Sequence, residues 1–194
     1  MTAVSLEQKL TPEDLRIGRL FLQQAQNAVV GATRGLSETQ WRFKPSPERW
    51  SVWENLIHIV TVQEFVLGPV LGQIANAPAP PAGVDSKAVD AIVIHQFPTR
   101  LAKFSAPESV HPREMAPPRE ALERLVANGA RFQQCLAATP GLREHAVPAP
   151  PLKAVSNGAF EVMDGYQWIL AAAAHTERHA MQMLEVMADK DYPE

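Results

Sequence analysis

Residues 171–182 read AAAAHTERHAMQ, a stretch whose composition is helical throughout. Within it, His175 and His179 lie four residues apart, so a helix places both imidazoles on one face, one turn apart. Two imidazoles at this spacing can chelate one divalent ion, as in other helical sites with this pattern. The spacing also arises by chance, and the alternative is a pair of ordinary helix histidines. A metal site requires a third ligand.

The candidate third ligand is His58, on an earlier helical stretch that begins after Ser51. Residues on facing helices of a bundle project inward, so His58, His175 and His179 are predicted to meet in one site. Three nitrogen donors suit zinc, nickel, copper or iron(II) rather than magnesium or calcium. They also leave coordination positions open for water or substrate, which is typical of catalytic metal sites.

Two polar residues lie one turn away from these histidines. Glu54 precedes His58, and it is either a base toward a metal-bound water or only the partner of Ser51 in a capping box. We expect the capping role. Gln182 follows His179, and it either lines the pocket and orients a ligand or fills polar space inside the bundle.

Long stretches nearly free of proline alternate with proline clusters, as in long helices joined by irregular connections. Apolar spacing and cap residues predict four long helices, at 11–33, 52 to beyond 65, 119–138 and 164–188. A short helix is expected at 86–95, and irregular chain at 98–118 and 141–162. Pro69 should kink or end the second long helix. We predict an all-α four-helix bundle with long irregular connections, one domain over residues 1–194, whose second connection allows a crossover.

The composition is that of an ordinary globular protein, with 46% hydrophobic and 20% charged residues. A net charge of -3 gives no sign of a nucleic-acid or anionic-membrane partner. The first residues lack a signal-peptide pattern, and no apolar stretch approaches the roughly 18 residues that span a bilayer. The single cysteine, Cys135, excludes an intramolecular disulfide and a cysteine-rich metal site. We expect a cytoplasmic protein that binds neither nucleic acid nor membrane.

The other candidate side chains carry weaker signals. Arg100 either receives an anionic substrate group or forms a surface salt bridge. Cys135 is expected to be a small buried residue, and Gly129 to permit close approach of a neighbouring helix. Ordinary polar roles are expected for His95, His111 and His145, and core or pocket-wall positions for Trp41, Trp50, Trp53 and Trp168.

Three stretches together resemble the DinB/YfiT-like superfamily of bacterial four-helix-bundle proteins. Residues 41–58 are similar to the family's Trp-Ser-x6-His start of the second helix, and residues 100–112 to its Ala-Pro-Glu…Pro connection. Residues 168–183 are similar to its His-x-x-Arg-His-x-x-Gln ending. The resemblance implies a divalent metal, often nickel or zinc, held by one histidine of the second helix and two of the fourth. These positions fall on His58, His175 and His179.

The resemblance also implies candidate functions. Some relatives are similar to thiol-dependent S-transferases, isomerases or related hydrolases, in which the metal activates a low-molecular-weight thiol. Loops 76–118 and 141–162 would then shape a pocket for the thiol and an electrophile. A homodimer is implied as well. The alternatives are a non-enzymatic metal-binding or stress-response module, and a structural bundle whose metal site is vestigial.

Overall fold

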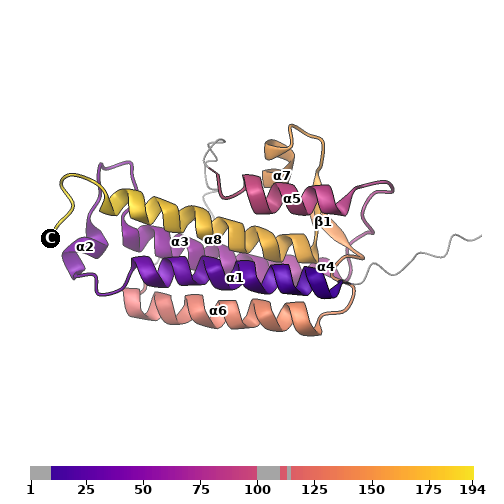
Figure 1. Cartoon of the computed structure of the whole chain (residues 1–194), viewed down its shortest axis with the longest axis horizontal. Helices are drawn as coiled ribbons and strands as arrows, with labels where there is room; N and C mark the ends of the chain where they lie inside the picture. Colours follow the sequence, from indigo (N-terminus) through magenta and orange to yellow (C-terminus); the bar gives the residue numbers. More distant parts are fainter. Residues whose placement is uncertain (1–9, 100–109, 113–114) are drawn as a thin grey trace, which may run out of the picture.

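The computed structural model describes residues 10–99, 110–112 and 115–194, and its centre is a bundle of four long helices (Figure 1). The four are α1 (Pro12–Ala32), α3 (Val52–Phe65), α6 (Pro118–Ala138) and α8 (Gly165–Met187). α1 and α3 each pack against both α6 and α8, so α1 lies diagonally opposite α3. The predicted all-α bundle is confirmed.

The chain does not simply alternate up and down through the bundle. α3 and α6 run in the same direction, and α8 runs opposite to both (Figure 1). The connection between α3 and α6 therefore returns the chain along the bundle, and it includes α5 (Ser86–Gln96), which packs against α8. The crossover that the long second connection allowed is present.

Local side-chain signals set the start of three of the long helices. Thr11, Ser51 and Asp164 each accept a hydrogen bond from the backbone N–H three residues on, and the side chain at that position bonds back to the cap residue. These bonds satisfy N–H groups that a helix start leaves without partners. The capping box expected at Ser51 is confirmed, and it fixes where His58 lies along α3.

Pro69 changes the geometry of the second long helix without ending its path. α3 passes into one π-helical turn, η1 (Val66–Val70), which contains Pro69, and then into α4 (Leu71–Ile74). Proline lacks a backbone N–H, and the wider turn accommodates the lost α-helical hydrogen bond. By length and composition the segment Val52–Ile74 could cross a membrane, contrary to the expectation that no stretch is long enough. It packs against α6 and α8, so it is a core helix and no membrane protein is indicated.

Short elements also occur where no helix or strand was predicted. α2 (Glu38–Arg42) precedes α3, and α7 (Pro150–Val155) lies between two strands, β1 (Ala146–Pro148) and β2 (Val162–Asp164). The strands pair antiparallel, with Ala146 opposite Asp164, and they form the sole sheet within the described residues. Three residues are too few for a recognisable apolar alternation, so sequence periodicity could not reveal them.

Buried apolar side chains form two clusters along the bundle. The first cluster includes Phe132, Tyr166 and Trp168, and Cys135 packs against it with a thiol pKa that burial raises. The second cluster surrounds the part of α3 and α8 that carries the histidines, and it contains Trp41, Trp53, Leu56 and Met183. The core positions expected for Trp41, Trp53 and Trp168 are confirmed.

Candidate metal centre

The three predicted imidazoles lie together between α3 and α8. The ring centroid of His179 is 4.6 Å from that of His58 and 4.4 Å from that of His175. The Nε2 atoms of His58 and His175 are 3.0 Å apart, and the candidate ligand nitrogens of all three residues lie within 4.8 Å of one another. α3 and α8 pack side by side in opposite directions, which brings residues 117 or more positions apart in sequence into one cluster.

His58 is held by a backbone carbonyl. Its Nδ1 lies 2.7 Å from the carbonyl oxygen of Val110, and its side chain is buried. A carbonyl oxygen can only accept, so Nδ1 of His58 carries the proton and donates. The Nε2 atom of His58 then carries the lone pair, and it faces His175.

His179 is held by a side-chain amide. Its Nδ1 lies 2.8 Å from Oδ1 of Asn55, and both residues are buried. The amide nitrogen of Asn55 donates to the carbonyl oxygen of Ser51 at 2.9 Å, which leaves Oδ1 to accept from His179. Nδ1 of His179 therefore carries the proton and Nε2 carries the lone pair.

His175 differs from the other two histidines. No described residue is a hydrogen-bond partner of its buried Nδ1 atom. Burial lowers the pKa of His175 well below its usual value, and the neighbouring His58 lowers it further. Burial also lowers the pKa of His58, against the hydrogen bond to Val110. Both rings are therefore neutral near pH 7, the form in which an imidazole binds a metal.

The donor set fits a tetrahedral or more open transition-metal site. Zinc–imidazole bonds of about 2.0–2.1 Å place ligand nitrogens about 3.3 Å apart in a tetrahedron, close to the 3.0 Å between His58 and His175. Partners at Nδ1 orient His58 and His179, as is usual for metal-binding histidines. Among the described residues no carboxylate joins the three rings, so the set disfavours calcium and magnesium.

Trp50 forms an aromatic wall beside the cluster. Its ring lies 4.7 Å from that of His58 and stacks on that of His179 at 6.0 Å and 24°. His111 meets the same indole edge-on at 5.9 Å, so this histidine lies next to the site although its sequence position gave no such signal. The expectation that Trp50 lines the core or pocket agrees with this geometry.

Glu54 and Gln182 have different surroundings. Glu54 accepts from the backbone N–H of Ser51 at 2.8 Å and from the Nζ of Lys44 at 3.0 Å, so the expected capping role is confirmed. Gln182, together with Trp50 and other residues, lines a cavity of about 190 Å³; the others are Glu48, Arg49, Asn55 and Val186. The position of Gln182 is that of a pocket residue.

The remaining candidates lie elsewhere. Nδ1 of His145 lies 2.6 Å from the carbonyl oxygen of Ala77, and His95 is exposed on α5. Arg100 lies outside the described residues, as does most of the 100–112 stretch. Sequence reasoning missed Asn55 and Val110. Asn55 precedes His58 by three residues and so lies near it on α3, which was a usable signal, whereas Val110 meets His58 only through the fold.

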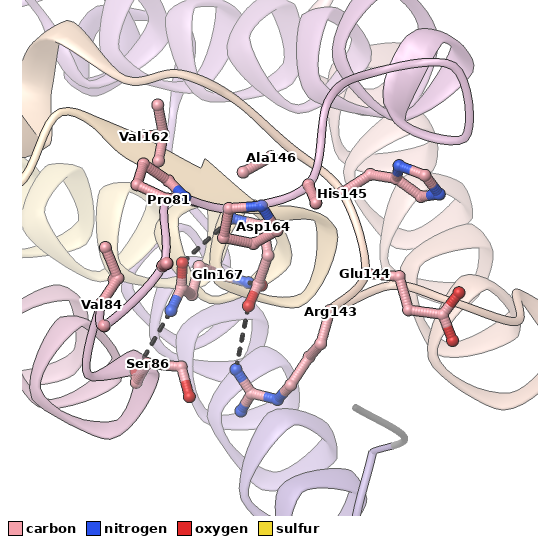
Figure 2. A pocket seen from close by; sticks show the side chains of 14 residues that line it. Pro81, Val84, Ser86, Arg143, Glu144, His145, Ala146, Val162, Asp164 and Gln167 are labelled. Carbon is pink, nitrogen blue, oxygen red and sulfur yellow. Dashed lines mark hydrogen bonds and ion pairs between the residues drawn. The ribbon is translucent and has the colours of Figure 1, made fainter. Parts of the chain in front are cut away.

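A larger cavity, of about 490 Å³, lies at the opposite end of α8. Figure 2 shows Asp164 in its wall, hydrogen-bonded to Arg143 and to Gln167, and Gln167 hydrogen-bonded to the carbonyl oxygen of Ser86. Asp164 precedes His175 by eleven residues of α8, which corresponds to about 16 Å along a helix. The cavity is therefore separate from the histidine cluster.

The charged groups at this end form a buried network around Arg143, which pairs with Asp14, Asp90 and Asp164. Burial raises the pKa of Asp164 to about 6, against the charge of Arg143. Burial also raises the pKa of Asp14. Hydrogen bonds from the Lys87 side chain and from the backbone N–H of Thr11 outweigh this effect of burial and leave Asp14 with a pKa of about 2. The network links the starts of α1 and α8 to α5.

The chain matches a known protein family. A sequence model of the DinB superfamily matches residues 22–183, a range that contains α3, most of α8 and all three clustered histidines. No curated protein and no solved structure matches the chain.

Proposed function

Because this chain belongs to the DinB superfamily, we propose that it is a metal-dependent enzyme whose ion, zinc or nickel, is held by His58, His175 and His179. The observation that carries this proposal is the orientation of the rings. The Nδ1 atoms of His58 and His179 each donate a hydrogen bond to an oxygen atom, of Val110 and Asn55 respectively. The Nε2 atom of each ring therefore carries the lone pair that can bind a metal. The family match and the three-histidine cluster fit a metal-binding protein, and the reaction is the further step that we propose.

The proposed reaction is transfer of a small thiol to an electrophile. A divalent ion held by neutral ligands keeps its full charge and lowers the pKa of a bound water or thiol. The S–H proton passes to solvent, a sulfur–carbon bond forms, and the bond from that carbon to its leaving group breaks, or an epoxide ring opens. Trp50 offers a flat apolar surface beside the rings, and the cavity at Gln182 offers space.

A metal-binding module without catalysis is the second candidate. Its support is the enclosure of the cluster, since His58 and His179 are buried and Trp50 covers one side. The two candidates differ in whether a thiol reaches the site. Dimerisation remains a prediction, to be checked by sedimentation equilibrium.

Metal content of tag-free protein, purified without chelator, tests the site. We expect about one zinc or nickel ion per chain, lost in His58→Ala and His179→Ala. His95→Ala, an exposed histidine on α5, is the matched control and should keep the metal. Absence of metal after reconstitution with zinc, nickel, manganese and iron(II) would refute the proposal.

Thiol conjugation then tests the reaction. We expect metal-loaded protein to accelerate conjugation of small thiols with a haloaromatic or an epoxide, and the acceleration to be lost in His179→Ala. A tightly held metal with no acceleration, and no spectral change when thiols are added to the nickel-loaded or cobalt-loaded protein, would favour the non-catalytic module instead.

A further inference from the structure

We propose that Asn55 is a positioning residue, which holds His179 in the tautomer that can bind a metal. The inference rests on the proposed function for its consequence in metal binding, but the tautomer itself is a property of the protein alone. Asn55 contributes two bonds: its Nδ2 donates to the Ser51 carbonyl at 2.9 Å, and its Oδ1 accepts from Nδ1 of His179 at 2.8 Å.

The first bond determines the direction of the second. The Ser51 carbonyl can only accept, so the amide of Asn55 must point its nitrogen toward it. A flipped amide would place two acceptor oxygens together at a buried residue, since Asn55 is 1% exposed, and this arrangement is costly. Oδ1 of Asn55 therefore faces His179 and accepts from it.

The second bond selects the tautomer of His179. With the proton on Nδ1, the lone pair lies on Nε2, the nitrogen on the far side of the ring from Asn55. With the opposite tautomer, two acceptors would meet at 2.8 Å and Nε2 would carry a hydrogen in place of the lone pair. Ser51, the cap residue of α3, thus determines through the amide of Asn55 which ring nitrogen of His179 carries the lone pair.

Within the described residues, the other two rings of the cluster are held differently. His58 is oriented by a backbone carbonyl, and Nδ1 of His175 has no hydrogen-bond partner among the described residues. Asn55 is therefore a side chain through which the geometry of the donor set can be altered without removing a donor.

The chain offers a matched control in Gln63. Its Nε2 donates to Oγ1 of Thr176 at 3.1 Å, a second buried polar link between α3 and α8, and this link touches none of the three imidazoles. Asn55→Leu and Gln63→Leu each remove one such link and leave an apolar side chain. Only Asn55→Leu should affect His179.

The first measurement is the tautomer of His179 in wild-type protein without added metal, from imidazole nitrogen shifts in long-range ¹H–¹⁵N spectra. We expect the proton on Nδ1 in wild type and in Gln63→Leu, and a loss of that preference in Asn55→Leu. A proton on Nε2 of His179 in wild type would overturn the inference, even if no variant folds.

The second measurement is zinc affinity by competition with a chromophoric chelator. We expect affinity to fall about 10–100-fold in Asn55→Leu and to be unchanged in Gln63→Leu. Wild-type affinity in Asn55→Leu would overturn the inference. If wild type itself binds no metal, the proposed function fails, and the tautomer measurement still decides the role of Asn55.

Discussion

Replacing Arg143 by methionine should destabilise the fold by about 3–5 kcal/mol, the usual cost of removing one partner from a buried ion network. The guanidinium lies 2.7 Å from a carboxylate oxygen of Asp90, 3.1 Å from one of Asp164 and 3.2 Å from one of Asp14. The Arg143 side chain is 4% exposed, so its charge is largely shielded from bulk water. Without it, three carboxylates remain together in the interior with Lys87 as their nearest cation.

The loss is large enough to measure by thermal unfolding. An unfolding entropy of about 2.1 cal/mol/K per residue over 194 residues gives about 0.4 kcal/mol/K, so the melting temperature should fall by about 7–12 °C. Arg119→Met is the control, because Arg119 pairs with Glu123 on the exposed face of α6. An exposed pair of this kind contributes less than about 1 kcal/mol.

Two results would refute this reasoning. The first is a loss in Arg143→Met no larger than that in Arg119→Met, measured by urea unfolding followed by circular dichroism. The second is an equal loss when Asp90 has first been changed to asparagine, since removing one carboxylate should reduce the penalty. Metal affinity should stay unchanged in Arg143→Met, because the network lies about 16 Å from the histidine cluster along α8.

Three further predictions concern single residues. The pKa of Asp14 in the folded protein is about 2, below the ordinary value of 3.8. Ionised Asp14 therefore stabilises the fold above pH 3.8, and this stabilisation is lost as the pH falls toward 2. The stability advantage of wild type over Asp14→Asn, measured by urea titration, should shrink by about 2 kcal/mol between about pH 5 and about pH 2. Glu54→Ala should lower stability by about 1 kcal/mol through loss of the capping box and leave zinc affinity unchanged, so a marked drop in affinity would contradict the capping role. Gly165→Ala should cost about 1–3 kcal/mol, since a Cβ would lie 2.7 Å from Cδ2 and 3.1 Å from the carbonyl oxygen of Leu142. Gly129→Ala, where the Cβ would meet only the end of a flexible side chain, is the comparison, and an equal loss there would argue against the Leu142 contact.

The sequence predicted the features that depend on neighbours along the chain. Capping residues at Thr11, Ser51 and Asp164 mark helix starts because the groups that satisfy the first N–H bonds lie within three residues. The spacing of His175 and His179 fixed their common face because a helix repeats every 3.6 residues. The two short strands escaped prediction because their pairing depends on residues that are distant in sequence.

Only the tertiary structure decided how the site is oriented and how the far end of the bundle is held. The carbonyl of Val110 reaches His58 across 52 positions, and the amide of Asn55 reaches His179 across 124. Arg143 likewise gathers three carboxylates from separate parts of the chain. The sequence by itself determined which side chains could serve as metal ligands and on which helices they lie. Their tautomers and distances depend on which buried groups face each other, and that is set by the packing of the helices and of the connection that carries Val110.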